Sequence, residues 1–485
     1  MLKEILSKAK LPSIIVDLAN NSKNYTIGQI FLQGFGIITL PIFTRLLSVD
    51  DYGVVSLFLY TNGVIVVIYS LGIGHPINRY YYEKKQDFGE LLFTAISFLF
   101  IFQIIVLSAG IIYSKELEYF IGLPKDLIVL AFCTSFFIPL IRVYQNLNIC
   151  MEKSVSYTSF QISRRIVIFL SCVILIYLLP YDPYYGRIIG ELFIIPFFLF
   201  TLFKLYKIIQ LKFSIRHIKY IFRIAMPLFP VMVAGIIFGQ IDRVVINKYL
   251  GVSDTGLYSY AYAISSLPGI FIVSIKSAWE PKLMKLLKMK NFHLINNITA
   301  LMITVYSFFM GLIIIFCQDI SLLLAPNSYQ AGVYITPLLI FSVFIATHES
   351  IYHGYIIFKK KLLFSIALIT IFVGILKLVL NIILIPQYGY IAAAYSSCIS
   401  YLVSLCFTYS VAKYLYGNSI YKLQYSIKQL LIILLSMIVY YCIYLTQTDL
   451  IVNILIKIIC IALLMLSSFM IIKKYLNTVQ SLEIE

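Results

Sequence analysis

Eight basic side chains stand inside apolar segments long enough to cross a bilayer. They are Arg142, Arg164, Arg165, Arg223, Arg243, Lys276, Lys377 and Lys457. A charge at the centre of a bilayer costs at least about 2.5–3.5 kcal/mol on insertion scales, so such residues normally face protein or water and are functional candidates. Arginine dominates the set, and its planar fork binds phosphate oxygens in a bidentate manner. This pattern favours the binding of a phosphorylated anion at membrane depth.

The predicted anion site is a set of cations expected to line a cavity between the helices. Its members are Arg142, Arg164, Arg165, Arg243, Lys377, Arg79 and Lys276. Lys377 is central in its apolar segment and is too deep to reach either interface comfortably. Arg164 and Arg165 diverge by about 100° on a helix, so only one of them can point squarely inward. Lys276 and Arg223 lie near segment ends and can snorkel.

Acidic residues at membrane depth are few, namely Glu191, Asp242 and Glu349. They either balance the buried cations or carry protons or sodium, because buried carboxylates with a raised pKa serve as proton carriers in transporters. The eight cysteines form no CxxC pair and no metal-like spacing with histidine. We therefore predict no metal site and no cofactor, and the choice between proton and sodium coupling stays open.

The segments that must position these residues are apolar runs of about 20 residues. The chain has 485 residues, of which 61% are hydrophobic and 12% are charged, whereas about a quarter is charged in a typical soluble domain. Runs of this length match a hydrocarbon core of about 30 Å. The fourteen predicted spans are 25–47, 53–74, 89–113, 126–149, 155–179, 186–206, 222–249, 256–278, 295–317, 333–358, 363–385, 388–412, 427–446 and 450–472.

Lysine and arginine are sorted between alternate loops. Loops after an even number of crossings carry 25 of the 38 basic residues, and loops on the opposite side carry five. Because cytoplasmic loops hold the excess of Lys and Arg, both termini are predicted to be cytoplasmic. The net charge of +17 then follows from topology and from attraction to anionic lipid head groups. Nucleic acid is not a predicted partner.

A short loop sequence occurs twice. Leu47–Ser56 and Leu250–Ser259 share five of ten residues at a fixed offset of 203. The loops join spans 1 and 2 and spans 7 and 8, so we expect two parallel six-helix repeats. The predicted organisation is an interfacial segment (1–24), a first bundle (25–207), a basic linker (208–221), a second bundle (222–412), two added helices (427–472) and a cytoplasmic tail (473–485).

Several short motifs follow one another in a characteristic order. They are Arg45–Gly53, Arg79–Glu83, Pro227–Pro230, Asp242-Arg243, Gly256–Tyr262, Ala278–Pro281 and Leu380–Gly389. In their order and spacing the chain resembles the polysaccharide (O-antigen-type) flippases of the multidrug/oligosaccharidyl-lipid/polysaccharide transporter superfamily.

The resemblance implies an all-α polytopic membrane protein with two six-helix bundles around a central cavity and two additional helices. It implies transport by alternating access of an undecaprenyl-diphosphate-linked oligosaccharide, such as an O-antigen or capsule repeat unit, to the outer leaflet of the bacterial inner membrane. Polysaccharide polymerase and other assembly enzymes are implied partners. The alternatives are a cation-coupled multidrug exporter and a membrane-embedded glycan polymerase or ligase. We find no nucleotide-binding or hydrolase motif, so an enzyme is not expected.

Overall fold

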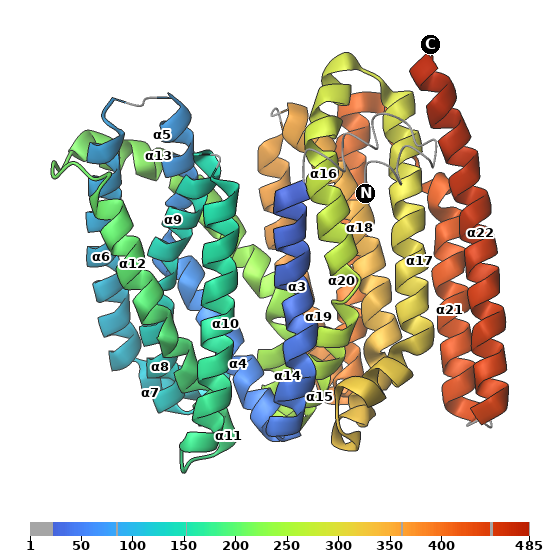
Figure 1. Ribbon diagram of the computed structural model, residues 1–485, viewed down its shortest axis with the longest axis horizontal. Coiled ribbons are helices and arrows are strands. Elements are labelled where there is room, and N and C mark those ends of the chain that lie inside the picture. The colour runs from blue at the N-terminus through green and yellow to red at the C-terminus, as the bar shows by residue number, and fades with distance from the viewer. Residues whose placement is uncertain (1–22, 84–85, 152, 360–361, 447–449, 485) are drawn as a thin grey trace. The chain divides into compact units, whose positions relative to one another are not determined.

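The computed structural model describes residues 23–83, 86–151, 153–359, 362–446 and 450–484 (Figure 1). Every regular element in these ranges is an α-helix or a short 3₁₀-helix. The all-α prediction is therefore confirmed. The predicted interfacial segment, 1–24, lies almost wholly outside the described residues.

The helices follow one another with short connections. In chain order they are α3 (Lys23–Leu46), α4 (Val49–Ser70), α5 (Gly74–Glu83), α6 (Phe88–Ile112), α7 (Ser114–Ile121), α8 (Lys125–Phe136), α9 (Ile138–Cys150), α10 (Ser154–Leu178), α11 (Pro183–Ile189), η1 (Gly190–Ile194), α12 (Ile195–Tyr206), α13 (Ile215–Gln240), α14 (Asp242–Leu250), α15 (Val252–Ser265), α16 (Gly269–Met289), α17 (Phe292–Leu324), η2 (Asn327–Ile335), α18 (Thr336–Lys359), α19 (Leu363–Tyr388), α20 (Ile391–Tyr416), η3 (Gly417–Ser419), η4 (Leu423–Ser426), α21 (Ile427–Thr446) and α22 (Leu450–Ile484).

Among the described residues, twelve helices are long and apolar enough to cross a membrane, or thirteen if one bent pair forms a single span. The chain is thus a multi-pass membrane protein, and twelve or thirteen of the fourteen predicted spans meet this criterion among the described residues. The bent pair, 252–265 with 269–276, changes direction by 46°. Pro268 stands at the bend, where the missing amide hydrogen favours a break. The predicted first span coincides with α3, of which only 34–46 counts as a shorter apolar helix.

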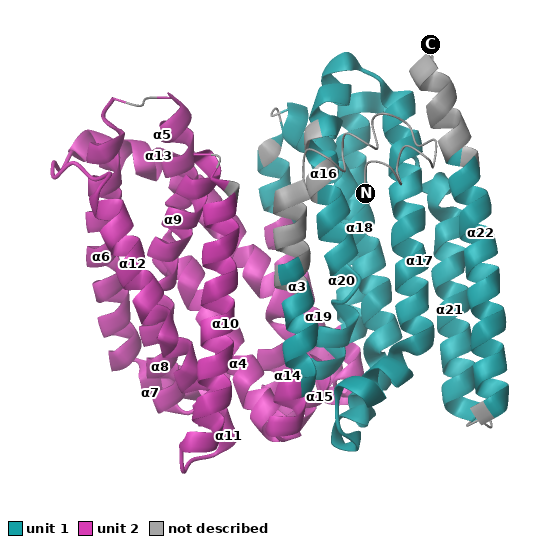
Figure 2. Cartoon of the chain, viewed as in Figure 1, with its two compact units in different colours: residues 1–41, 260–369, 394–485 teal, residues 42–259, 370–393 magenta. Residues whose placement is uncertain are grey.

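The chain forms two compact units, coloured separately in Figure 2. Unit 1 contains residues 1–41, 260–369 and 394–485, and unit 2 contains 42–259 and 370–393. These units cut across the predicted halves, because α13 and α14 belong with the helices of the first half. Within unit 2, α13 packs on α4, α5 and α6, which accounts for this grouping.

The predicted linker at 208–221 is not a free connection. The Gln210 amide donates to the Gly89 carbonyl at 3.2 Å, and Lys212 Nζ lies 2.8 Å from Glu90 Oε1. Ser214 N donates to Thr94 Oγ1 at 3.2 Å. These contacts fix the linker to the first turns of α6, and the rest of the predicted linker is already helix α13.

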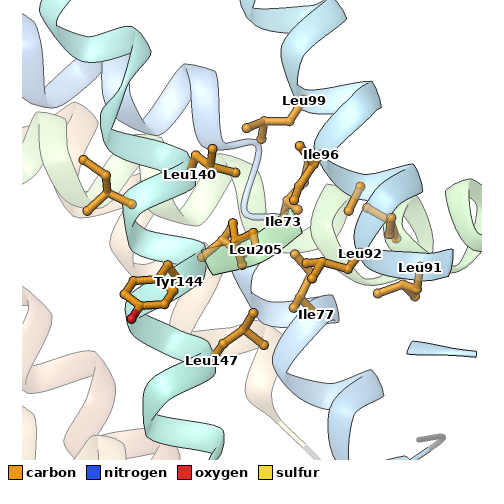
Figure 3. Packing of buried hydrophobic residues seen from close by; sticks show 14 of the residues in the cluster. Ile73, Ile77, Leu91, Leu92, Ile96, Leu99, Leu140, Tyr144, Leu147 and Leu205 are labelled. Carbon is orange, nitrogen blue, oxygen red and sulfur yellow. The ribbon is translucent and has the colours of Figure 1, made fainter. Parts of the chain in front are cut away.

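Unit 2 has an apolar core in which side chains of α5, α6, α9 and α12 converge (Figure 3). Ile77, Leu91, Leu140 and Leu205 in this core are at most 1% exposed. Lipid tails are as apolar as leucine, so close van der Waals packing rather than the hydrophobic effect holds such helices together. This packing gives α9 and α10 a fixed support.

In unit 1 the two added helices, α21 and α22, pack on α17. Two residues of α18 hold the segment that connects α20 to α21. Tyr352 Oη donates to the Tyr421 carbonyl at 2.9 Å, and His348 Nε2 lies 2.9 Å from Ser426 Oγ. In α22, Lys457 Nζ pairs with Asp319 Oδ2 at 2.6 Å. Lys457 thus forms an ionic contact between α22 and α17.

Candidate functional site

Three of the predicted arginines lie on two consecutive helices of unit 2. Arg142 is on α9, and Arg164 and Arg165 are on α10. Helix α10 is apolar along most of its length, but Tyr157, Gln161 and the arginines follow one another at intervals of three and four residues, which places them on one side of the helix. We call Arg142, Arg164 and Arg165 the arginine cluster.

The cluster is ordered by a chain of hydrogen bonds along α10. Gln161 Nε2 donates to Tyr157 Oη at 3.0 Å, and Arg164 Nη2 donates to Gln161 Oε1 at 3.4 Å. The charges of Arg142 and Arg165 both act on the half-buried Arg164 guanidinium, as does the carboxylate of Glu191. Like charges held this close repel one another unless an anion compensates them.

The part of the chain that the structure describes offers the cluster no dedicated counter-ion. Of its members, Arg142 and Arg165 are exposed. Glu191, the nearest acid in electrostatic terms, is already engaged at 2.6 Å by Arg187 Nη1. Three guanidinium forks without a paired carboxylate form a site suited to phosphate oxygens.

Lys377 contradicts the sequence prediction that it is a free cation for an anionic ligand. Its side chain is 3% exposed, and Nζ lies 2.9 Å from Asp242 Oδ2, whose side chain is fully buried. Nζ also donates to the Phe238 carbonyl at 2.9 Å and lies 5.4 Å from the centroid of the Phe238 ring. Two of the three ammonium donors are engaged by these partners, so Lys377 balances the charge of Asp242.

Two residues that sequence reasoning missed complete this ion pair. Asn381 Nδ2 donates to Asp242 Oδ1 at 2.7 Å, and Tyr258 Oη donates to Asp242 Oδ2 at 2.7 Å. Asn381 follows Lys377 by four residues and therefore shares its helix face, a signal that was available in the sequence. The role of Tyr258 depends on the meeting of α14 and α15, which spacing alone does not reveal.

The other predicted cations have surroundings that differ from those of the arginine cluster. Arg243 is buried in the first turn of α14, and its charge acts on the buried Tyr60. Lys276, in unit 1, lies 3.7 Å from Glu280 on the same helix. On α5, Nε of the exposed Arg79 donates to Glu83 Oε1 at 2.6 Å, and this hydrogen bond raises the pKa of the guanidinium.

The three membrane-depth acids each have a partner of a different kind. Asp242 is held by Lys377 and Glu191 by Arg187. Glu349, on α18, accepts a hydrogen bond from Ser404 Oγ at 2.5 Å and lies 3.5 Å from His353 Nε2. Among the described residues, Glu349 is thus the one of these acids that has no lysine or arginine within ion-pair distance.

Comparison with known protein families assigns this chain to one of them. The sequence profile of the family described as "Polysaccharide biosynthesis protein" matches residues 18–287, more than half of the chain. A protein of the Lsg locus of Haemophilus influenzae is 23% identical over 55% of this chain and 66% of its own length. The succinoglycan biosynthesis transport protein ExoT of Rhizobium meliloti is 22% identical over 50% of this chain and 48% of its own length. The matched part of the chain therefore spans about half to two thirds of the length of these relatives.

Solved structures show the same fold. The lipid II flippase MurJ, in an inward closed conformation, superimposes with a TM-score of 0.70 at 19% identity, covering 91% of this chain and 97% of that one. An inward-facing multidrug resistance MATE transporter of the MOP superfamily gives 0.59 at 14% identity, covering 80% and 96%. The chain belongs to the polysaccharide biosynthesis protein family and shares the fold of these solved transporters.

Proposed function

We propose that this transporter flips an undecaprenyl-diphosphate-linked oligosaccharide, such as an O-antigen or capsule repeat unit, from the cytoplasmic to the outer leaflet of the bacterial inner membrane. The observation that carries the proposal is the arginine cluster, in which Arg142, Arg164 and Arg165 lie at membrane depth with no paired carboxylate among the described residues. A diphosphate that leaves water needs compensating charge, and these three forks supply it.

The mechanism assigns a separate task to each part of the cluster. Arg142 and Arg165, both exposed, form the first bidentate contacts with the diphosphate, and Arg164, fixed by Gln161, completes them. The anion removes the repulsion among the three guanidinium groups, so binding is stronger than for one arginine. Alternating access then carries the bound head group across while the sugar stays in water.

Unit 1 by itself contains an apolar groove with the chemistry that an isoprenoid chain requires. A groove of about 690 Å³ runs between α21 and α22, and its walls include Leu431, Leu435, Leu464 and Met470. Lys428 lies among its lining residues, at the first turn of α21. An apolar groove between two helices outside the repeated part of the chain suits an isoprenoid chain better than a compact drug, which favours lipid-linked cargo.

Coupling to an ion gradient is assigned to Glu349. Asp242 is neutralised by the Lys377 ammonium, so protonating it would leave a buried lysine charge uncompensated, which is costly. Glu349 has a hydroxyl and an imidazole as neighbours instead. It can therefore gain and lose a proton without stranding a paired cation.

The test measures binding of a purified undecaprenyl-diphosphate oligosaccharide to the detergent-solubilised protein. Single Ala variants of Arg142, Arg164 and Arg165 are each expected to weaken binding about tenfold, which corresponds to about 1.4 kcal/mol. Arg223→Ala is the control, because this exposed arginine of α13 is outside the cluster. Unchanged binding in all three cluster variants, or tighter binding of a cationic drug than of the lipid diphosphate, would overturn the assignment.

A further inference from the structure

A second groove lies on the outside of unit 2, between α10 and α12. Its volume is about 390 Å³. One wall carries Ser156, Ser159 and Ser163 from α10, and the opposite wall carries Phe197 and Phe200 from α12. Three small side chains at intervals of three and four residues leave a strip along α10 without bulk, and the aromatic rings of the neighbouring helix line the space that results.

This groove lies on an exposed, mostly apolar face of α10, away from Arg165. Ser159 and Ser163 are exposed, and the residues that continue the same helix face, Leu170 and Ile174, are 49% and 53% exposed. Exposed leucine and isoleucine at membrane depth contact acyl chains. Arg165 follows Ser163 by two residues, about 200° around the helix, and therefore points to the other side.

Lysines gather at one end of the groove. Lys204 Nζ lies 5.2 Å from the centroid of the Phe200 ring, which forms part of the wall. One turn further along α12, Lys207 Nζ lies 4.6 Å from the Phe203 ring centroid. Lys153 caps the start of α10, one turn before Ser156. Within the described residues, no carboxylate forms an ion pair with any of these lysines.

We propose that this groove binds an anionic glycerophospholipid of the inner leaflet. The phosphate lies at Lys204, Lys207 and Lys153, and one acyl chain occupies the strip between the serines and the phenylalanines. Charge complementarity selects the occupant, since basic residues near an anionic leaflet attract its phosphate head groups. Lysine is a point charge that suits a single phosphate, whereas the forks of the arginine cluster suit a diphosphate.

A lipid in this groove would contact both α10 and α12 and would stabilise their packing. Helix α10 carries two members of the arginine cluster, and the groove is the side of α10 on which protein packing is incomplete. A bound acyl chain supplies the missing contacts and holds α10 against α12. The lipid is therefore a structural cofactor of the unit that carries the arginines, and its binding does not depend on the proposed cargo.

The experiment compares thermal unfolding of the delipidated, detergent-solubilised protein with added phosphatidylglycerol or phosphatidylcholine. Phosphatidylglycerol is expected to raise the melting temperature by several degrees more than phosphatidylcholine. The double variant Lys204→Ala/Lys207→Ala should lose most of this difference, and Ser159→Phe, which fills the groove but keeps the lysines, should lose it as well. Lys285→Ala/Lys288→Ala is the control, because these exposed lysines of α16 belong to unit 1.

Native mass spectrometry of the same samples identifies the occupant. Wild-type protein should retain phosphatidylglycerol in preference to phosphatidylcholine and to undecaprenyl phosphate. Equal stabilisation by both phospholipids, or a lipid effect that survives in both groove variants, would overturn the proposal. Preferential retention of undecaprenyl phosphate would also overturn it and would assign the groove to the cargo lipid.

Discussion

Gly53 and Gly256 occupy equivalent positions in the two copies of the repeated loop, and each packs against the helix start of the other copy. A Cβ atom at Gly53 would overlap the carbonyl oxygen of Val252, and one at Gly256 would overlap that of Val49. Val49 and Val252 are themselves separated by the repeat offset of 203. The contact is therefore reciprocal, as in a two-fold symmetric interface, and it joins the first turns of α4 and α15.

Adding one methyl group at either glycine is expected to destabilise unit 2. The obstructing atoms are backbone atoms, which cannot rotate away, so Gly53→Ala and Gly256→Ala should each cost about 1–3 kcal/mol or more. The melting temperature of the solubilised protein measures the effect. Gly239→Ala is the matched control, since no heavy atom lies within 4 Å of a Cβ added there. Equal melting temperatures for all three variants would show that the helix starts separate easily.

Much of the fold was predictable because the bilayer enforces long apolar helices. Helix positions and the repeated loop followed from composition and spacing. The positions at which helices break were not predictable. For example, α13 ends at Gln240 and α14 starts at Asp242, although no proline stands at that point. The grouping of α13 with the first half depends on long-range contacts of the linker with α6, which no local pattern encodes.

The candidate site was predictable in residue type but not in pairing. Arg164 and Lys377 look alike in the sequence, since each is a cation in an apolar segment. The structure separates them by their partners: Lys377 meets Asp242, 135 residues away in the chain, whereas Arg164 meets a glutamine on its own helix. Contact between α14 and α19 decides the role of Lys377, and that contact has no signature in spacing.

Removing Lys377 alone is expected to be far more damaging than removing the whole ion pair. Lys377→Met leaves the buried Asp242 carboxylate uncompensated, which costs about 3–5 kcal/mol. The double variant Lys377→Met/Asp242→Asn should recover most of that loss and keep binding of the lipid diphosphate. Size-exclusion profiles, melting temperatures and binding measurements report on these outcomes. If the double variant folds as well as wild type but no longer binds the lipid, Lys377 or Asp242 contacts cargo after all.

Arg164→Lys tests whether the fork or only the charge of the cluster matters. Lysine keeps the positive charge but cannot form two parallel hydrogen bonds, so we expect lipid diphosphate binding about three- to tenfold weaker than in wild type. Binding of an undecaprenyl monophosphate should fall less, because it needs fewer hydrogen bonds. Titrations with both lipids provide the comparison. Wild-type affinity of Arg164→Lys for the diphosphate would reduce the role of Arg164 to charge alone.

Asp87 should make the stability of unit 2 sensitive to acid. Tyr80 Oη donates to Asp87 Oδ1 at 2.7 Å, and Arg216 Nη2 lies 2.6 Å from Oδ2. The hydrogen bond from Tyr80 is the main reason that the pKa of Asp87 is lowered, while burial raises the pKa of Tyr80 to about 12. A carboxyl whose pKa is lower in the folded protein stabilises it above the unfolded pKa of about 3.9 and loses this contribution as the pH falls further.

The corresponding experiment compares melting temperatures between pH 7 and pH 3. Wild type should exceed Asp87→Asn at pH 7, and the difference should shrink as the pH falls below about 4, where the carboxylate is protonated. Tyr80→Phe removes the donor that lowers the pKa of Asp87, so its acid-dependent loss of stability should be smaller and should be complete at a higher pH than in wild type. Asp50→Asn, which changes an exposed residue in the first turn of α4, serves as control. A constant difference between wild type and Asp87→Asn at every pH would mean that Asp87 acts through packing rather than charge.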